Sequence, residues 1–157
     1  MRLTLPVAFI SSIFLFLPLT LAQAQTVPLQ MASLQHADIA KIAAKHAASN
    51  GIPVALVEAV ITVESSWQRG ARNGSSVGLM QIEPLTARSL GYKGETSQLY
   101  DPETNIRFGT RYLAEAYRLS SGDLCTTVAR YQSGHNMVKP NAANRAYCKK
   151  MQALLTP

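Results

Sequence analysis

The chain is poor in the side chains that metal and redox sites require. Its 157 residues include two cysteines and three histidines. Cys125 and Cys148 are too far apart to form a Cys-x-x-Cys motif, and the histidines do not have the spacing of metal ligands. The sequence also lacks a glycine-rich phosphate loop and a recognisable Ser/His/Asp arrangement. A redox motif, a zinc ribbon and a bound metal are therefore not indicated, and we expect no cofactor.

Long apolar runs are missing outside the N-terminus. There, a positive residue precedes an apolar stretch that leads into Ala22-Gln23-Ala24, which fits a signal-peptide cleavage site. The apolar centre, residues 7–17, is short beside the roughly 20 residues of a membrane span. We therefore expect a signal peptide over residues 1–24, with a retained anchor as the alternative. Residues 25–157 would form one periplasmic or secreted domain without stable membrane insertion.

The two cysteines are expected to pair if the chain is exported. An even number of cysteines in an oxidising compartment favours a disulfide. A bond between Cys125 and Cys148 would close a loop of about 24 residues and stabilise the fold by roughly 3 kcal/mol. The alternative is a pair of buried thiols, and we favour the disulfide because the predicted signal peptide directs the chain to such a compartment.

Acidic residues are few, with nine Asp and Glu against fifteen Lys and Arg, and the formal net charge is +6. A basic exported protein is suited to an anionic polymer or a membrane surface. The basic residues are scattered, with neither a dense run nor interleaved aromatic residues. Nucleic acid is therefore the weaker interpretation, and we expect no nucleic-acid partner.

No segment alternates strongly enough to indicate a strand, so the sequence predicts an all-α domain of about six helices. The second helix is rich in β-branched residues, but its length and its leading proline, Pro53, favour a helix. Residues 26–35 are expected to form a loose lead-in and residues 68–77 a loop. The expected helices cover residues 37–50, 53–64, 84–90, 102–119, 124–132 and 140–155.

One glutamate stands out within this pattern. Glu64 completes a helical stripe that begins with Val57, Val60 and Ile61. A carboxyl group on an apolar face is either paired or kept neutral, because a buried unpaired charge is costly. A carboxylic acid that stays protonated near neutral pH can serve as a general acid. Glu64 is therefore the candidate catalytic residue.

Four motifs in order extend this interpretation. They are Glu64-Ser65-Ser66, Gly78-Leu79-Met80-Gln81-Ile82, Asn105-Ile106 with Gly109 and Tyr112-Leu113, and Ala129-Arg130-Tyr131-Gln132-Ser133-Gly134. Together they resemble the motifs of lytic transglycosylases, lysozyme-like enzymes that cleave peptidoglycan glycan strands. The resemblance implies a compact lysozyme-like helical domain with a substrate cleft. It also implies that Glu64 is the sole catalytic carboxylate.

The resemblance further implies a reaction and a set of contacts. Glu64 would protonate the glycosidic oxygen, and it would then act as a base on the C6 hydroxyl of N-acetylmuramic acid, whose N-acetyl group assists. The product would be a 1,6-anhydromuramoyl end. Gln81, Tyr131 and Ser76 are the expected substrate-binding residues, with Tyr131 facing Glu64. Asn105 is expected to hold the segment 78–82, and Trp67 either lines the cleft or covers the core.

Two positions depart from the family pattern. Glu83 stands where a methionine is common, and it either adds a second acid to the cleft, binding sugar, or points to solvent. Gln132 replaces an asparagine. Two alternatives remain for function. One is a hydrolytic muramidase, which a second carboxylate would favour, with Glu83, Glu95 and Asp101 as the candidates nearby in sequence. The other is a non-catalytic peptidoglycan-binding assembly factor. The expected partners are peptidoglycan strands and components of a secretion or conjugation machine.

Overall fold

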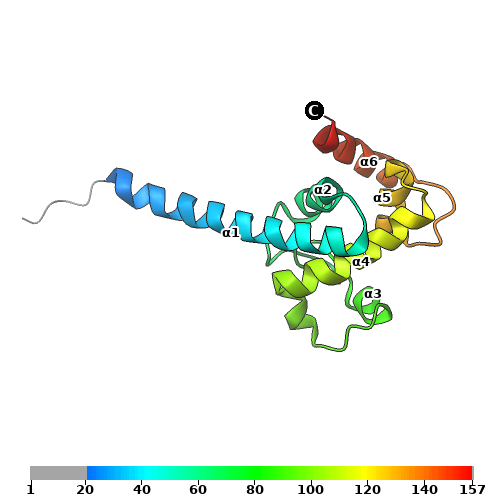
Figure 1. The fold of residues 1–157 in the computed structure, drawn as a ribbon, viewed down its shortest axis with the longest axis horizontal. Helices are drawn as coiled ribbons and strands as arrows, with labels where there is room; N and C mark the ends of the chain where they lie inside the picture. The colour runs from blue at the N-terminus through cyan, green and yellow to red at the C-terminus, as the bar shows by residue number, and fades with distance from the viewer. Residues whose placement is uncertain (1–20, 157) are drawn as a thin grey trace, which may run out of the picture. The chain divides into compact units, whose positions relative to one another are not determined.

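The computed structural model describes residues 21–156, with side chains from residue 35 (Figure 1). The chain divides into two units, Met1–Ser33 and Leu34–Pro157. Most of the predicted signal peptide lies outside the described residues. The elements are α1 (Leu21–Asn50), α2 (Val54–Ser65), β1 (Arg72–Asn73), β2 (Ser76–Val77), α3 (Pro84–Ser89), the 3-10 helix η1 (Thr96–Tyr100), α4 (Pro102–Leu119), α5 (Leu124–Ser133) and α6 (Ala142–Leu155). The all-α prediction is confirmed, apart from one very small sheet.

Capping residues set most of the helix boundaries. Asp101 accepts a hydrogen bond from the Thr104 backbone N–H at 2.9 Å, and this contact starts α4 directly before Pro102. α1 ends at Asn50 because Gly51 takes a left-handed conformation, with φ 68°. α5 and α6 begin with the same kind of side-chain cap, from Asp123 and Asn141. These local signals explain why the predicted helix boundaries, apart from the start of α1, agree with the structure to within about two residues.

Two segments differ from the prediction. Residues 26–35, expected as a loose lead-in, belong to α1, which begins at Leu21. That part of the chain lacks a period and contains Pro28, which opposes a helix, whereas six of its ten residues are Ala, Gln, Leu or Met, which favour one. The expected loop 68–77 contains the β1–β2 hairpin, with Arg72 opposite Val77. Strands of two residues are too short for any alternation to show in the sequence.

The predicted apolar stripe of α2 lies in the main core. Val57, Val60 and Ile61 are fully buried there. The same cluster includes Leu79, Met80, Ile106, Leu113, Val128 and Met151. A smaller cluster of Val77, Ile82, Ala87, Tyr92, Leu99 and Phe108 lies beneath the hairpin and α3. Leu79, Met80 and Ile82 are therefore core residues.

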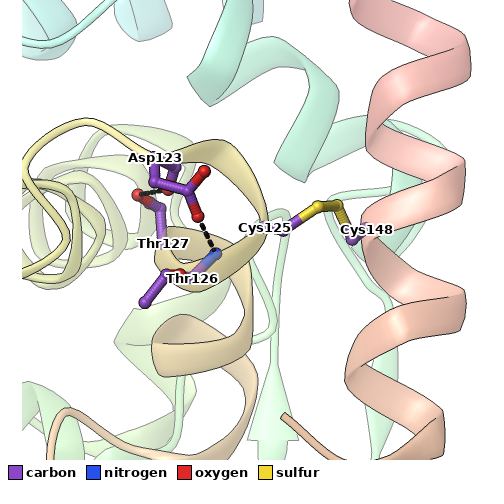
Figure 2. The surroundings of a disulfide bond; sticks show 5 residues. All are labelled: Asp123, Cys125, Thr126, Thr127 and Cys148. Atoms are coloured by element: carbon purple, nitrogen blue, oxygen red, sulfur yellow. Dashed lines mark hydrogen bonds between the residues drawn. A yellow bond between two sulfur atoms is a disulfide. The ribbon is translucent and has the colours of Figure 1, made fainter. Parts of the chain in front are cut away.

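The predicted disulfide is present and joins α5 to α6 (Figure 2). The Cα atoms of Cys125 and Cys148 are 5.1 Å apart, a normal separation for a disulfide. Asp123, next to this bond in Figure 2, caps α5 by accepting from the Thr126 N–H at 2.8 Å. α6 also contacts α2 (Figure 1). Among residues 21–156, none of the helices has the length and apolar character that crossing a membrane requires.

Candidate active site

A cleft of about 500 Å³ opens beside the C-terminal end of α2. Its walls come from five parts of the domain: α2, the β1–β2 hairpin, the segment 81–83 with α3, α4, and the end of α5. The lining residues are Glu64, Asn73, Ser76, Gln81, Ile82, Glu83, Thr86, Tyr112, Tyr131, Gln132, Ser133 and Gly134. The structure therefore brings together all the predicted catalytic and substrate-binding residues, Glu64, Gln81, Tyr131, Ser76 and Glu83.

Glu64 lies at the inner wall of this cleft, in the last turn of α2. Burial raises the pKa of its carboxyl group, and this effect outweighs the opposing effects of a hydrogen bond from Tyr147 and the positive charge of Lys150. The C-terminal end of a helix also carries partial negative charge, which further disfavours a carboxylate. Glu64 thus retains its proton to a higher pH than an exposed glutamate would, as a general acid requires.

Tyr147 holds the Glu64 carboxyl group in place. Its hydroxyl donates a hydrogen bond of 2.8 Å to Oε1 of Glu64. Among the described residues, no hydrogen bond reaches Oε2, so this oxygen is free to carry the proton that a general acid transfers. Sequence reasoning missed Tyr147. It lies on a buried stripe of α6 with Cys148 and Met151, and a buried tyrosine hydroxyl needs a partner, which was the available signal.

Asn105 fixes the segment 78–82, as predicted. It is fully buried on α4, and its Oδ1 accepts from the Met80 N–H at 2.8 Å. Its Nδ2 donates to the carbonyl oxygens of Val77 at 2.9 Å and Leu99 at 2.7 Å. One amide therefore satisfies three buried backbone groups and ties the cleft floor to η1 and α4.

Two glycines allow the close packing around Asn105. Gly78 has φ 76°, and a Cβ atom there would lie 2.8 Å from the Leu99 carbonyl oxygen. At Gly109 of α4, a Cβ would lie 2.6 Å from the Met80 sulfur. The chain 78–82 can therefore lie against α4 only because both positions lack side chains.

Tyr131 and Gln81 line the cleft, but their polar atoms also support it. The Tyr131 hydroxyl donates to the Met80 carbonyl oxygen at 2.7 Å, and not to Glu64. Burial is the main cause that raises the pKa of the Tyr131 hydroxyl, and the negative charge of Glu64 adds to it. Tyr131 is therefore close enough to Glu64 for their charges to interact. Gln81 has φ 45°, and its Nε2 donates to the carbonyl oxygens of Ala71 and Gly78. Both side chains therefore shape the cleft as well as facing it.

Tyr112 is a second cleft residue, which the sequence analysis named only as part of a motif. Its ring stacks on His135 with centroids 4.0 Å apart, and it tilts against the ring of Tyr131 at 5.5 Å. Burial raises its pKa, and the charge of Glu83 adds to this effect. Helical spacing alone could not separate a core tyrosine from one at the rim of a cleft.

The open alternatives for two residues now have answers. Glu83 is exposed and also lines the cleft, where its Oε1 accepts from the Ser75 hydroxyl at 3.0 Å. Trp67 does not line the cleft. It packs against the core, stacks on His36 with ring centroids 3.8 Å apart, and donates from Nε1 to the Thr62 hydroxyl.

Gln132 lines the cleft and contributes to its support. Its Oε1 accepts from Nδ2 of the buried Asn144 on α6 at 2.7 Å, and the same Nδ2 also donates to Ser133 Oγ at 2.8 Å. The Gln132 side chain therefore connects the cleft wall on α5 to α6. Within the part of the chain described by the structure, no three His, Cys, Asp or Glu side chains gather as metal ligands would.

A desolvated glutamate at the end of one helix, facing a cleft across a small hairpin in a helical domain, defines a lysozyme-like architecture. The 70 kDa soluble lytic transglycosylase of Escherichia coli shares it, with a TM-score of 0.57 and 26% identity over 73% of this chain and 19% of that one. Residues 41–153 match the model of the family described as "Transglycosylase SLT domain". The chain belongs to this family.

Relatives by sequence agree with this assignment. The soluble lytic murein transglycosylase of Escherichia coli is 34% identical over 110 residues, which are 65% of this chain and 17% of that protein. The membrane-bound lytic murein transglycosylase E of Buchnera aphidicola is 43% identical over 67 residues, 38% of this chain and 30% of its own length. The chain thus spans less than one fifth of the first of these relatives.

Proposed function

We propose that this chain is a peptidoglycan lytic transglycosylase that cleaves the β-1,4 bond between N-acetylmuramic acid and N-acetylglucosamine. The observation that carries the proposal is the state of Glu64. It faces the cleft, burial raises its pKa, and one carboxyl oxygen is held by Tyr147. Cleavage of a glycosidic bond requires a proton donor for the leaving oxygen, and Glu64 has the properties of that donor.

The proposed reaction uses Glu64 twice. Its proton passes to the glycosidic oxygen as the bond to C1 of N-acetylmuramic acid breaks, and the N-acetyl oxygen of that sugar stabilises the developing positive charge at C1. The Glu64 carboxylate then removes the proton from the C6 hydroxyl, and the C6 oxygen forms a bond to C1. The products are a 1,6-anhydromuramoyl end and a free C4 hydroxyl, and Glu64 regains its proton. No water is consumed.

The Tyr147 hydrogen bond supports both steps. It favours the charged carboxylate, so it lowers the energy of Glu64 between the two proton transfers. It also fixes the orientation of the carboxyl group, and a fixed donor is more effective than a mobile one. Tyr131, which binds the Met80 carbonyl, would keep the cleft floor rigid while substrate occupies it.

Mass spectrometry of products from purified sacculi tests the proposal. Anhydro ends are lighter by one water than the reducing ends that a hydrolytic muramidase leaves. Among the described cleft residues Glu83 is the other carboxylate, so the hydrolytic alternative would depend on it. Glu64→Gln should abolish product formation while the protein still folds and melts cooperatively. If wild-type protein binds sacculi and releases nothing, the chain is a binding factor and the proposal is wrong.

We also propose where the protein acts. The predicted signal peptide over residues 1–24 and the predicted disulfide support a periplasmic or secreted enzyme. Service to a secretion or conjugation machine that must cross the cell wall is the accompanying proposal. Fractionation of cells that produce the full chain, followed by detection of the protein cleaved near Ala24, tests the location.

A further inference from the structure

The cleft differs in charge from the rest of the protein. The chain carries fifteen Lys and Arg against nine Asp and Glu. Its cleft nevertheless has two lining carboxyl groups, Glu64 and Glu83, and no lining Lys or Arg among the described residues. The proposed reaction accounts for Glu64. It does not use Glu83, so a negative charge at the cleft wall needs another explanation.

Glu83 is held at this wall by its neighbours. It directly precedes Pro84 of α3, and its Oε1 accepts a hydrogen bond of 3.0 Å from Ser75, in the turn between β1 and β2. Within residues 35–156 it takes part in no ion pair, whereas Glu103 and Glu115 each contact a cation. Glu83 thus offers an oriented carboxylate whose charge is not neutralised by the protein.

The charge of Glu83 reaches the interior of the cleft. It adds to the rise in the pKa of Tyr112, whose ring contacts that of Tyr131. The charge of Glu64 in turn raises the pKa of Tyr131. Both carboxyl groups also line the same cleft, so Glu83 lies at the groove that holds Glu64.

We propose that Glu83 is a specificity-determining residue that binds a protonated primary amine on the substrate. This inference rests on the proposed function and names a substrate class for it. An ammonium group is the natural partner of an oriented, unpaired carboxylate, and charge-assisted hydrogen bonds are the stronger kind. Two sources on peptidoglycan have this chemistry: a glucosamine unit that has lost its acetyl group, and a free amine of the peptide stem.

The size of the expected preference follows from the exposure of Glu83. Exposed ion pairs contribute little, and partial desolvation by a bound sugar strengthens them. A preference of about threefold to tenfold for the amine over its acetylated form is therefore expected. The preference should fall as salt is raised, because salt screens exposed charges.

Calorimetric titration of the Glu64→Gln variant measures binding without turnover. The first probe is chitotetraose, compared with the same tetrasaccharide carrying one deacetylated unit, at a pH where the amine is protonated. The second is a muropeptide with a free stem amine, compared with its N-acetylated form. We expect one of the two pairs to show the preference, and the pair that does identifies the source of the amine.

The double variant Glu64→Gln/Glu83→Gln should lose that preference. The matched control, Glu64→Gln/Glu58→Gln, removes the same charge from α2 at a residue that does not line the cleft, and it should keep the preference. Equal binding within both pairs, or a preference that survives Glu83→Gln, overturns the inference. Product analysis with sacculi tests the proposed function separately, because these titrations involve no cleavage.

Discussion

The hydroxyl of Tyr147 lies 2.8 Å from Oε1 of Glu64, although the two residues are 83 positions apart. α2 therefore carries the proposed acid, while α6, the last helix of the domain, carries the group that orients it. The site is complete only when α6 is packed against α2 and α5.

Replacement of Tyr147 by phenylalanine tests this relationship. The lost hydrogen bond favours the charged carboxylate, so its removal should raise the pKa of Glu64 further. Since the acid must be protonated to act, the alkaline limb of the pH–rate profile should move to higher pH. The maximal rate should fall by roughly tenfold or more, because the acid is less well oriented. The measurement is the pH dependence of product release from sacculi.

A matched control is Tyr117→Phe, which removes a hydroxyl from a partly buried tyrosine that packs against the core. Its pH–rate profile should coincide with that of the unmodified protein. If Tyr147→Phe instead lowered the rate without moving the alkaline limb, the hydrogen bond would have no part in setting the protonation of Glu64.

Glu64 should also affect how stability depends on pH. Burial raises its folded-state pKa above the ordinary glutamate value of 4.5, so the folded protein binds the proton more tightly than the unfolded chain. The free energy of unfolding should therefore fall as pH rises from about 4.5 through the folded-state pKa, and level off above it. Glu64→Gln should remove this fall and be more stable than the unmodified protein at alkaline pH. Urea unfolding across this pH range measures both curves, and parallel curves would contradict the prediction.

Asn105→Ala should be strongly destabilising. It leaves the Met80 N–H and the carbonyl oxygens of Val77 and Leu99 without their partner in a buried site. The expected loss in free energy of unfolding is about 2–4 kcal/mol, with loss of activity because the cleft floor is no longer fixed. Asn105→Asp keeps the oxygen that accepts from Met80 but loses the amide N–H groups that donate to Val77 and Leu99. If this variant were as stable as the unmodified protein, the two donated hydrogen bonds would contribute nothing. Urea unfolding gives both values.

Loss of the Cys125–Cys148 bond should lower the free energy of unfolding by about 3 kcal/mol. The double variant Cys125→Ser/Cys148→Ser and the reduced protein should behave alike in urea unfolding. The reductant should have no effect on the double variant, which serves as the control for its other actions. A stability that is unchanged by reduction would show that helix packing alone holds α6.

The helices were predictable because their ends carry their own signals. Asp101-Pro102, Asp123 and Asn141 cap helices through contacts within a few residues, and Gly51 ends one in the same way. The hairpin and the early start of α1 were not predictable. Two-residue strands have no period, and propensity without a period made the N-terminal segment ambiguous.

The residues of the candidate site also differ in how far the sequence alone could predict them. Glu64 could be found because its stripe lies within one helix, and Asn105 because its motif identified it. Tyr147 and Tyr112 were missed since their roles depend on which helices meet in space. Tyr131 was expected to face Glu64. In the structure its hydroxyl donates to the Met80 carbonyl oxygen, and Tyr147 supplies the hydrogen bond to Glu64.

Cys148 immediately follows Tyr147 on α6, and Cys125 lies on α5, the helix that carries Tyr131. The covalent link thus braces the two helices from which both tyrosines near the glutamate project. A newly made molecule with both thiols still reduced lacks that brace, so its proton donor is least securely held before oxidation. Formation of the disulfide is therefore expected to help assemble the proposed catalytic site.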